Sequence, residues 1–371
     1  MILKSDCKYF PGDRPCKYHK EDKIICSVCP HYKEAGNFIL IIKLDAIGDV
    51  LRTTSVLHAL KEKYPDSSIV WLTKENARDI FKLNPLVDEV ITVESPNLIS
   101  DLSITEFNIV INLDPSPVSS SFASFAKAPV KIGYGLNGKG KVFPFNPEAE
   151  EWFEMGAFDS LKKKNTKSYQ QIIHEICSLD YKKGKIIFNL SESENKKSEE
   201  FFVSRSLGNF DKIIGINAGA SDRWQFKKWR QEGYESVIKQ LAGKYNCAFL
   251  LFGGMNETEL NRELSKLSKN IFDTGSRNSL RELASYIKLV DVLITGDTLA
   301  LHIATALNKQ VVCIFGPTSS AEIEDYGTVS KIVPEIDCLV CYKNTCGFTP
   351  NCMELVTGEM IYNTVKTILD R

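Results

Sequence analysis

The chain of 371 residues is long enough for two domains, and its 43% hydrophobic and 25% charged residues are typical of a folded protein rather than a disordered one. Its 46 basic and 47 acidic side chains leave a net charge of −1, which argues against nucleic acid as a partner. The start lacks the apolar core of a signal peptide and no apolar run is of membrane-spanning length, so we expect a cytoplasmic protein with at most peripheral contact at the inner face of the cell membrane.

Residues 1–36 form a cysteine-rich extension ahead of the first predicted strand. Its cysteines have the spacing C-x8-C-x9-C-x2-C. Clustered thiols in a reducing compartment favour metal ligation over disulfides, and a C-x2-C pair with two further thiols fits zinc or an iron–sulfur cluster. The predicted ligands are Cys7, Cys16, Cys26 and Cys29.

Residues 37–180 have the pattern of a domain with a parallel β-sheet. Apolar runs of strand length stand at 37–44, 68–72, 87–93 and 107–113. They alternate with amphipathic segments such as 50–64, which is typical of stacked βα units. Residues 134–168 are rich in Gly, Pro, Lys and Asn, and we expect loops there rather than sheet. A helix over 168–179 leads towards the domain junction.

The loop KLDAIGD, residues 43–49, follows the first strand, and ligands of such sheets bind beyond the carboxyl ends of the strands. Gly48 allows a close turn of the backbone, and Asp49 stands at the start of the next helix. Asp49 has two interpretations. It either caps that helix or serves as a carboxylate that takes a proton from an attacking hydroxyl.

Residues 181–335 repeat the alternation and predict a second domain. Strands are expected at 211–218, 247–254, 290–297 and 310–318, and helices at about 231–244, 278–289 and 298–307. Two successive βα sheets indicate an α/β protein with two Rossmann-like domains that face a central cleft.

Two loops of this second domain have residues suited to a nucleotide diphosphate. The first loop, residues 219–230, has the sequence GASDRWQFKKWR and combines a small-residue turn at Ser221 with cations that include Lys227. It is either a binding site for phosphates or a basic loop that faces solvent. FGGMNE, residues 252–257, has a turn at Gly253, and Glu257 could accept hydrogen bonds from ribose hydroxyls.

A third loop, GDTLALH at 296–302, opens a predicted helix. Asp297 and Thr298 lie at its start, and His302 is four residues after Thr298 and therefore on the same helix face. A lone helical histidine is more often a packed structural residue, but at the carboxyl end of a strand it is also a candidate phosphate contact.

Residues 336–371 contain a second cysteine group and a final helix. The spacing C-x2-C-x4-C-x5-C again fits four-sulfur ligation. The predicted ligands are Cys338, Cys341, Cys346 and Cys352. We favour a purely structural metal, zinc or iron, over free thiols and over a redox role. The three other cysteines, Cys177, Cys247 and Cys313, are expected to be buried small hydrophobic residues.

Together these loops resemble glycosyltransferase family 9, the ADP-heptose:lipopolysaccharide heptosyltransferases and their relatives, over about residues 38–360. The matching motifs are Gly48-Asp49, Lys227 two residues before Trp229, Gly253-Gly254 with Glu257, Asp297-Thr298 with His302, and Phe315 to Thr318. Two positions depart from the family pattern. Leu299 replaces the usual glycine after Asp-Thr, and Asp45-Ala46 stand where serines are common, so Asp45 could assist or compete with Asp49.

The resemblance implies a GT-B architecture and inversion at the anomeric carbon without a catalytic metal. Asp49 would act as general base, and Lys227, Thr298 and His302 would stabilise the leaving diphosphate. The implied donor is a nucleotide diphosphate sugar, first ADP-heptose, and the acceptor is lipopolysaccharide, another lipid-linked or surface glycan, or a protein. Autotransporter heptosyltransferases of the family bind iron through cysteines. GT-B proteins commonly return their last helix to the first domain, which would bring the two cysteine groups close together.

Two other classes of function stay open at this point. The cysteines could form a redox or sensing centre on a transferase scaffold, in which case the protein would be coloured and sensitive to oxygen. Alternatively, the chain could bind a nucleotide sugar without turnover, and Leu299 supports that reading. The presence of Asp49, Lys227 and His302 argues for the enzyme.

Overall fold

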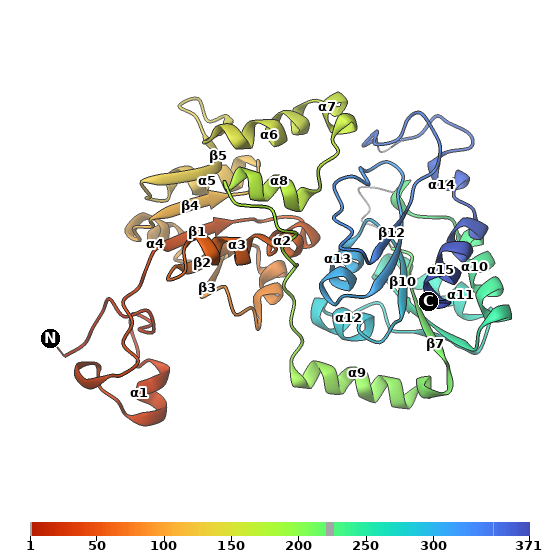
Figure 1. The fold of residues 1–371 in the computed structure, drawn as a ribbon, viewed down its shortest axis with the longest axis horizontal. Coiled ribbons are helices and arrows are strands. Elements are labelled where there is room, and N and C mark those ends of the chain that lie inside the picture. Colours follow the sequence, from red (N-terminus) through yellow and green to blue (C-terminus); the bar gives the residue numbers. More distant parts are fainter. Residues whose placement is uncertain (1, 220–225, 344) are drawn as a thin grey trace.

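The computed structural model describes residues 2–219, 226–343 and 345–371. Within these ranges the chain forms two α/β domains, each built on a six-stranded sheet, and they lie side by side (Figure 1). Residues 2–36 form a small extension at the outer side of the first domain. The expected pair of α/β domains is confirmed. No helix in the described ranges is both long enough and apolar enough to cross a membrane.

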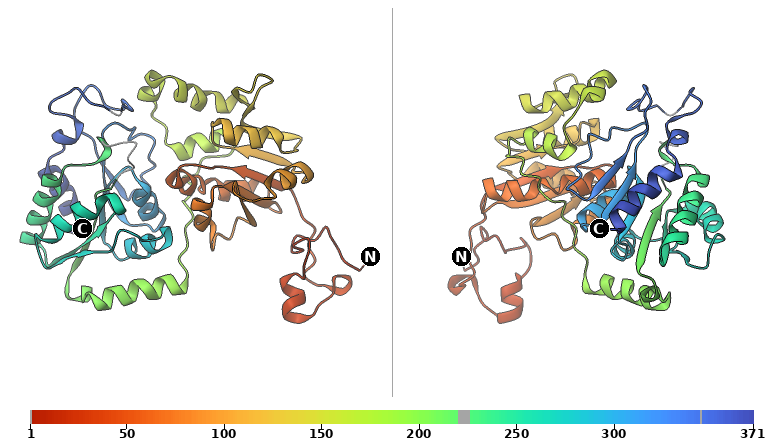
Figure 2. Two further views of the ribbon diagram at one scale, coloured as in Figure 1. Left: turned by 180° about the vertical axis from the view of Figure 1, so that it is seen from behind. Right: turned by 45° about the vertical axis from the view of Figure 1, so that its right-hand side comes forward.

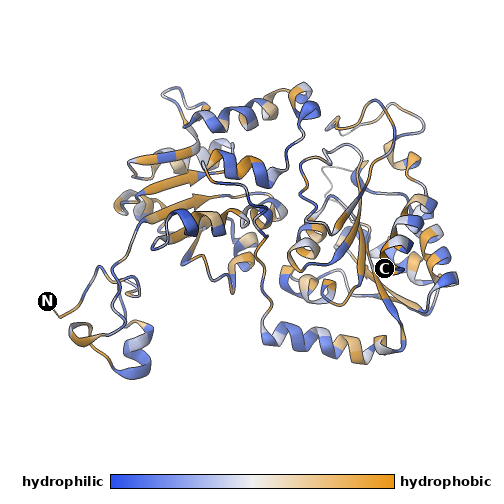
Figure 3. Cartoon of the chain, in the orientation of Figure 1, coloured by the Kyte–Doolittle hydropathy of each residue, from blue (hydrophilic) through white to orange (hydrophobic). Residues whose placement is uncertain are grey.

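The first sheet has the strand order β3-β2-β1-β4-β5-β6, and all pairs are parallel except β5 with β6. Its strands are β1 (Phe38–Ile42), β2 (Ser68–Thr73), β3 (Glu89–Thr92), β4 (Ile109–Asn112), β5 (Val130–Leu136) and β6 (Val142–Pro144). Ile39 and Ile41 of β1 belong to one core, and Leu40 and Ile42 belong to the core on the opposite face. Burial on both faces explains the unbroken apolar run, and the central strands are accordingly orange in Figure 3.

The helices of this domain are α2 (Ile47–Thr53), α3 (Val56–Lys63), α4 (Leu98–Ile104), α5 (Pro117–Phe125), α6 (Glu150–Ala157), α7 (Asp159–Lys164) and α8 (Tyr169–Ile176), with a 3-10 helix η2 (Glu75–Phe81). The amphipathic segment 50–64 is two helices rather than one. The Thr54 hydroxyl donates to Leu51 O at 2.7 Å and accepts from Ile187 N at 2.9 Å. These bonds hold the break between α2 and α3.

The expectation that residues 134–168 are loops is wrong in large part. β5 pairs with β4 as far as Gly133 and continues to Leu136, and β6 returns through a short turn to pair antiparallel with residues 134–136. The glycines in this hairpin have a packing role, since a Cβ on Gly135 would lie 2.0 Å from the Phe145 ring. Helices α6 and α7 follow where the sequence shows no strong apolar periodicity.

The second sheet has the order β12-β11-β10-β7-β8-β9 and is parallel throughout. Its strands are β7 (Lys212–Asn217), β8 (Cys247–Phe252), β9 (Ile271–Asp273), β10 (Val292–Gly296), β11 (Gln310–Ile314) and β12 (Val329–Ile332). Its helices are α9 (Glu192–Ser204), α10 (Gln231–Lys244), α11 (Thr258–Ser265), α12 (Leu280–Ile287), α13 (Leu299–Ala306), α14 (Cys352–Leu355) and α15 (Gly358–Leu369). Cys177, Cys247 and Cys313 are buried, as expected.

The two domains share one continuous hydrophobic core, which includes Val50 and Leu51 of α2 together with Leu301 and Ile303 of α13. Helix α13 packs against α2, and α12 packs against η2. The carboxyl ends of β1 and β10 both lead into this contact, because α2 follows β1 and α13 follows β10. The loops that the sequence singled out therefore meet between the domains.

The C-terminal helix does not return to the first domain. Helix α15 packs against α10 and against β10, β11 and β12, all in the second domain. The extension at residues 2–36 and the segment at 336–352 lie at opposite sides of the molecule in all views (Figures 1 and 2). The expectation that the two cysteine groups lie close together is therefore wrong.

Candidate functional site

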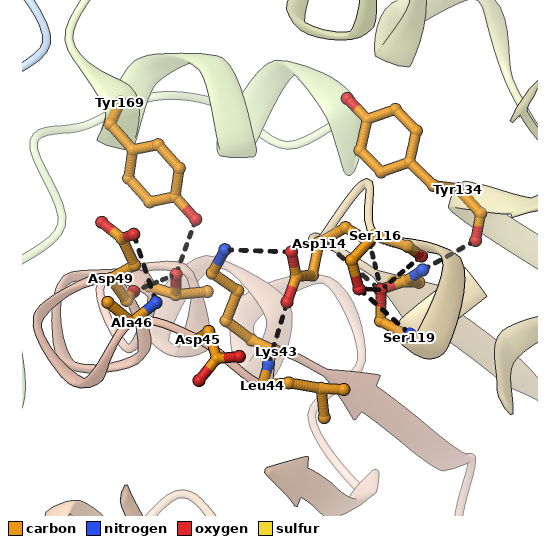
Figure 4. Close-up of polar contacts among 12 residues, drawn as sticks. Lys43, Leu44, Asp45, Ala46, Asp49, Asp114, Ser116, Ser119, Tyr134 and Tyr169 are labelled. Carbon is orange, nitrogen blue, oxygen red and sulfur yellow. Dashed lines mark hydrogen bonds and ion pairs between the residues drawn. The ribbon is translucent and has the colours of Figure 1, made fainter. Parts of the chain in front are cut away.

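Asp49 lies in the first turn of α2, directly after β1 (Figure 4). Its Oδ2 accepts a hydrogen bond from Ala46 N at 3.3 Å, so the helix-cap interpretation is correct in part. Its Oδ1 lies 2.8 Å from Arg52 Nη2, and 36% of the side chain is exposed. Burial acts to raise the pKa of Asp49, but the cations Arg52 and Lys43 outweigh it and hold the pKa below its ordinary value. Asp49 is therefore an ionised and accessible carboxylate at neutral pH.

Arg52 connects Asp49 to both domains. Its guanidinium stacks on the ring of Tyr169 at 3.9 Å, and its Nη1 donates to Glu322 O of the second domain at 3.4 Å. Tyr169 N donates to the same carbonyl at 3.0 Å, and its hydroxyl is 2.8 Å from Thr53 Oγ1. The position of Arg52, and with it the charge beside Asp49, thus depends on how the two domains are arranged.

Lys43 supplies a second buried cation behind Asp49. Its Nζ is 3.8 Å from Asp114 Oδ1, and Asp114 Oδ2 accepts from Leu44 N at 3.3 Å (Figure 4). Burial acts to lower the pKa of Lys43, but Tyr169, Asp114 and Asp49 raise it to about 12. Lys43 is therefore a fixed positive charge at this edge of the sheet.

Asp45 takes no part in this network. Its carboxylate is hydrogen-bonded to Lys74 Nζ and points away from the carboxylate of Asp49 (Figure 4). The possibility that Asp45 assists or competes with Asp49 is not supported by this arrangement.

On the second domain, Lys227 and Asp297 form a close ion pair. Lys227 Nζ lies 2.7 Å from Asp297 Oδ2, and the Thr318 hydroxyl donates to the same oxygen at 2.9 Å. Burial acts to raise the pKa of Asp297, but Lys227 and His302 lower it to about 2. Trp229 is buried and its Nε1 donates to Val356 O at 3.0 Å, which anchors the segment that carries Lys227. The Lys-x-Trp spacing thus has a structural cause.

His302 projects from α13 towards the first domain. A Cβ built on Gly48 would lie 2.9 Å from His302 Cδ2, so Gly48 is needed for contact between the domains rather than for a turn. Burial and the charge of Arg52 lower the pKa of His302 to about 4, against the opposite effect of Asp297 and Asp49. The imidazole is therefore neutral at pH 7.

Thr298 stands at the N-cap of α13, but its side chain makes no cap hydrogen bond to the helix. Its hydroxyl accepts from Asn217 Nδ2 at 3.2 Å and lies 3.1 Å from Thr295 Oγ1. Backbone N–H groups at such a helix start suit an anion. Thr298 thus fixes the start of α13 next to the Lys227–Asp297 pair.

Glu257 lies beneath two glycines of this domain. Its Oε2 accepts from Gly254 N at 2.9 Å, and its Oε1 is 3.2 Å from Lys228 Nζ. A Cβ on Gly253 would lie 2.6 Å from Glu257 Cβ, and one on Gly219 would lie 3.0 Å from Glu257 Cδ. Gly253 therefore leaves room for the Glu257 side chain, and Gly219 leaves room for its carboxylate. Ser221, also predicted to bind the donor, lies outside the described residues.

The structure thus gathers Gly48, Asp49, Lys227, Asp297, Thr298 and His302 at the boundary between the domains, with Glu257 at the edge of the second domain. Sequence reasoning missed Arg52, Tyr169 and Glu322. Arg52 had a weak signal, because it follows Asp49 at a spacing of three within a helix. Tyr169 and Glu322 are brought to the site only by the tertiary fold.

The two cysteine groups differ in geometry. Cys338, Cys341, Cys346 and Cys352 line one cavity of about 20 Å³, and burial and the other three thiols raise the pKa of Cys352 to about 11. The N-terminal cysteines line a cavity of about 510 Å³. Within the described ranges, no group of three or more His, Cys, Asp or Glu side chains is positioned to hold a metal ion. The metal ligation expected at the two cysteine groups is therefore not seen among the described residues.

Solved structures share this fold. The Veillonella parvula glycosyl transferase of family 9 has a TM-score of 0.70 at 20% identity, covering 90% of this chain and 97% of that one. The Escherichia coli ADP-heptose LPS heptosyltransferase II has a TM-score of 0.65 at 19% identity, covering 89% and 98%. The iron-containing dodecameric glycosyltransferase TibC of enterotoxigenic E. coli has a TM-score of 0.57 at 12% identity, covering 91% and 77%. These likenesses confirm a GT-B-like fold.

Sequence comparison gives the family. Lipopolysaccharide heptosyltransferase 1 of Campylobacter coli is 24% identical over 313 residues, which are 80% of this chain and 88% of that protein. The model of glycosyltransferase family 9 (heptosyltransferase) matches residues 97–351, more than half of the chain. The match includes the Lys227, Asp297 and His302 loops described above. The protein is a glycosyltransferase and belongs to family 9.

Proposed function

We propose that the protein transfers heptose from ADP-heptose to a hydroxyl of a lipopolysaccharide acceptor, with inversion at the anomeric carbon. The proposal rests chiefly on one observation: Asp49 of the first domain lies opposite the Lys227–Asp297–His302 cluster of the second. The names of the C. coli and E. coli relatives support heptose as the sugar and lipopolysaccharide as the acceptor. Such an acceptor would bring the protein to the inner face of the cell membrane.

On the donor side, Lys227 would contact the diphosphate. Its ammonium already lies at the start of α13, held by Asp297 and by a segment anchored at Trp229. A cation and helix N–H groups at this point stabilise charge that develops on the leaving diphosphate. Glu257, fixed by Gly254 N, is the proposed contact for the ribose hydroxyls.

On the acceptor side, Asp49 would accept the proton of the attacking hydroxyl. Its low pKa keeps it ionised, and Arg52 would stabilise the carboxylate and orient it. The proton passes from the acceptor oxygen to Asp49 as that oxygen bonds to the anomeric carbon, while the bond to the diphosphate oxygen breaks. Neutral His302 would be able to donate a hydrogen bond to the substrate without adding charge beside Asp49.

The test is donor binding and product formation with ADP-heptose and a lipopolysaccharide that lacks core heptose. We expect transfer by the wild-type chain and a product of inverted configuration by NMR. Lys227→Ala should weaken donor binding about 10- to 100-fold in calorimetry, whereas Lys239→Ala, an exposed lysine on α10, should not. Binding without turnover for every acceptor tried would support a non-catalytic binder and overturn the proposal.

We also propose that the C-terminal cysteines hold one structural metal ion. Cys338, Cys341, Cys346 and Cys352 share a cavity of about 20 Å³, which is the volume of little more than one water-sized probe. A small closure of the loop around an ion would bring the thiolates into tetrahedral contact. The iron content of TibC supports iron as one candidate, and zinc is the other. Metal analysis of Cys338→Ser/Cys341→Ser against wild type tests the site.

A further inference from the structure

The N-terminal cysteine module, residues 2–36, has no hydrophobic core. None of its residues is fully buried, and its regular structure comprises α1 (Lys17–Asp22), a 3-10 turn η1 (Cys26–Val28) and one bridge between Cys7 and Glu34. Ile25 and Val28 are exposed. Segments of this size usually need a disulfide or a metal to fold, because they bury too little apolar surface. All four cysteines in the module are free.

The four thiols instead surround one cavity. Cys7 lies at the bridge, Cys16 is the N-cap residue of α1, and Cys26 and Cys29 are the first residue and the C-cap of η1. Three separate parts of the module therefore supply the four cysteines, and Cys26 and Cys29 come from the same turn. All four line the same space of about 510 Å³, together with the rings of Tyr9, Tyr18, His31 and Tyr32.

The size of this space favours a larger group over a single ion. A tetrahedral zinc ion places four sulfurs about 2.3 Å from one point and therefore within about 4 Å of one another. Neither cysteine group has this close arrangement in the part of the chain that the structure describes, so the comparison rests on the sizes of the two cavities. The C-terminal cysteines, by comparison, line a cavity of about 20 Å³. The space that the N-terminal cysteines line is therefore much the larger of the two.

The chemistry of the lining fits a sulfur-ligated cluster. Aromatic rings surround the thiols, and Tyr18 stacks on His31 with ring centroids 4.0 Å apart. Apolar walls of this kind limit the access of solvent to a cluster. Residues 2–36 contain seven Lys and Arg against five Asp and Glu, which offsets part of the negative charge of four thiolates.

We propose that Cys7, Cys16, Cys26 and Cys29 hold an iron–sulfur cluster that gives the N-terminal module its fold. The role is structural and goes beyond the proposed transfer reaction. The module contacts the first domain through the loop before β2, where Lys33 Nζ lies 2.5 Å from Asp66 Oδ1 and Lys8 Nζ lies 3.4 Å from Ser67 O. Loss of the cluster should therefore unfold residues 2–36 and leave the two domains intact.

The experiment is anaerobic purification of the full chain, followed by assay of iron, acid-labile sulfide and zinc and by a visible spectrum. We expect iron and sulfide in equal amounts and a broad absorbance that Cys26→Ser/Cys29→Ser removes. The control Cys338→Ser/Cys341→Ser should retain the sulfide and the absorbance. One equivalent of zinc without sulfide, lost only with the N-terminal cysteines, would overturn the proposal, and so would metal-free protein.

A second measurement separates the cluster from general misfolding of the variant. The wild-type chain is stripped of metal and examined by hydrogen exchange over residues 2–36. Protection should be lost, and iron with sulfide should restore it. Protection that persists in the stripped protein, or that zinc alone restores, would contradict the assignment. Unchanged exchange in β1 and β7 shows that the rest of the chain is folded.

Discussion

Gly48 of the first domain and His302 of the second are in contact, and a Cβ on Gly48 would lie 2.9 Å from the imidazole Cδ2. This contact brings two separate sequence motifs to one place. It sets how closely Asp49, the next residue, approaches the Lys227–Asp297 pair. The distance between the proposed base and the donor site therefore depends on the absence of a side chain at position 48.

Gly48→Ala should displace α13 from α2 and lower transfer activity. A misplacement of about 1 Å at the reacting groups can cost about 100-fold, and we expect kcat/KM to fall about 10- to 100-fold. Steady-state kinetics would show this. Gly138→Ala is the matched control, because a Cβ there has no heavy atom within 4 Å and should leave kcat/KM unchanged. Equal activity in both variants would show that the contact is not tight in solution.

Arg52→Gln should raise the pKa of Asp49, because Arg52 is its foremost cationic partner at 2.8 Å. In the wild type the pKa of Asp49 lies below 3.8, so the acid limb of kcat/KM should lie below about pH 4. In the variant this limb should move to higher pH as Asp49 becomes easier to protonate. A pH–rate profile measures both. An acid limb that stays in place would mean that another group is the base.

His302 should remain neutral across the physiological range, since burial and Arg52 lower its pKa to about 4. Its proton signals in NMR should be constant from pH 8 to pH 5, with His302→Gln used for assignment. Because the pKa is below its ordinary 6.5, this group contributes stability fully above pH 6.5 and loses it as pH falls towards 4. A titration midpoint near 6.5 would contradict the buried position.

Arg281 connects the two domains, and it also lowers the pKa of Glu194. Arg281 donates to Asp79 O at 2.9 Å, and hydrogen bonds from Arg281 lower the pKa of Glu194 to about 2. The pair should contribute about 1–2 kcal/mol above pH 4.5 after allowance for solvent screening, and lose it as pH falls from 4.5 towards 2. Glu194→Gln should therefore lower the Tm at pH 7 and approach wild type near pH 2. Glu259→Gln, an exposed carboxylate, is the control.

Most of the sheet could be predicted from sequence, because strands such as β7 and β8 are buried on both faces and show as unbroken apolar runs. The β5–β6 hairpin was missed, since its glycines are required by contacts with Asn112 and Phe145 that only the tertiary fold creates. Helix α9 was also missed, although Ser191 and Glu194 form a capping box at its start.

In the candidate site, too, the features set by local sequence could be predicted and those created by the tertiary fold could not. The positions of Asp49, Lys227 and His302 could be predicted because these residues follow predicted strands, in loops or in the first turns of the next helices. The protonation states of these groups could not be predicted. They depend on Arg52, which is held in place by a hydrogen bond to Glu322 O across the domain boundary. The last helix was predicted to return to the first domain, as is common in GT-B proteins. This prediction was wrong, because α15 packs on α10 in the second domain.

The central claim is that Asp49 is the general base, and the most direct measurement compares Asp49→Asn with Asp45→Asn. Both changes remove one carboxylate from the same loop, but only Asp49 lies opposite the donor cluster, while Asp45 pairs with Lys74. We predict that Asp49→Asn lowers kcat about 10²- to 10⁴-fold with donor affinity retained, and that Asp45→Asn stays near wild type. Retained activity in Asp49→Asn, or loss confined to Asp45→Asn, would contradict the account.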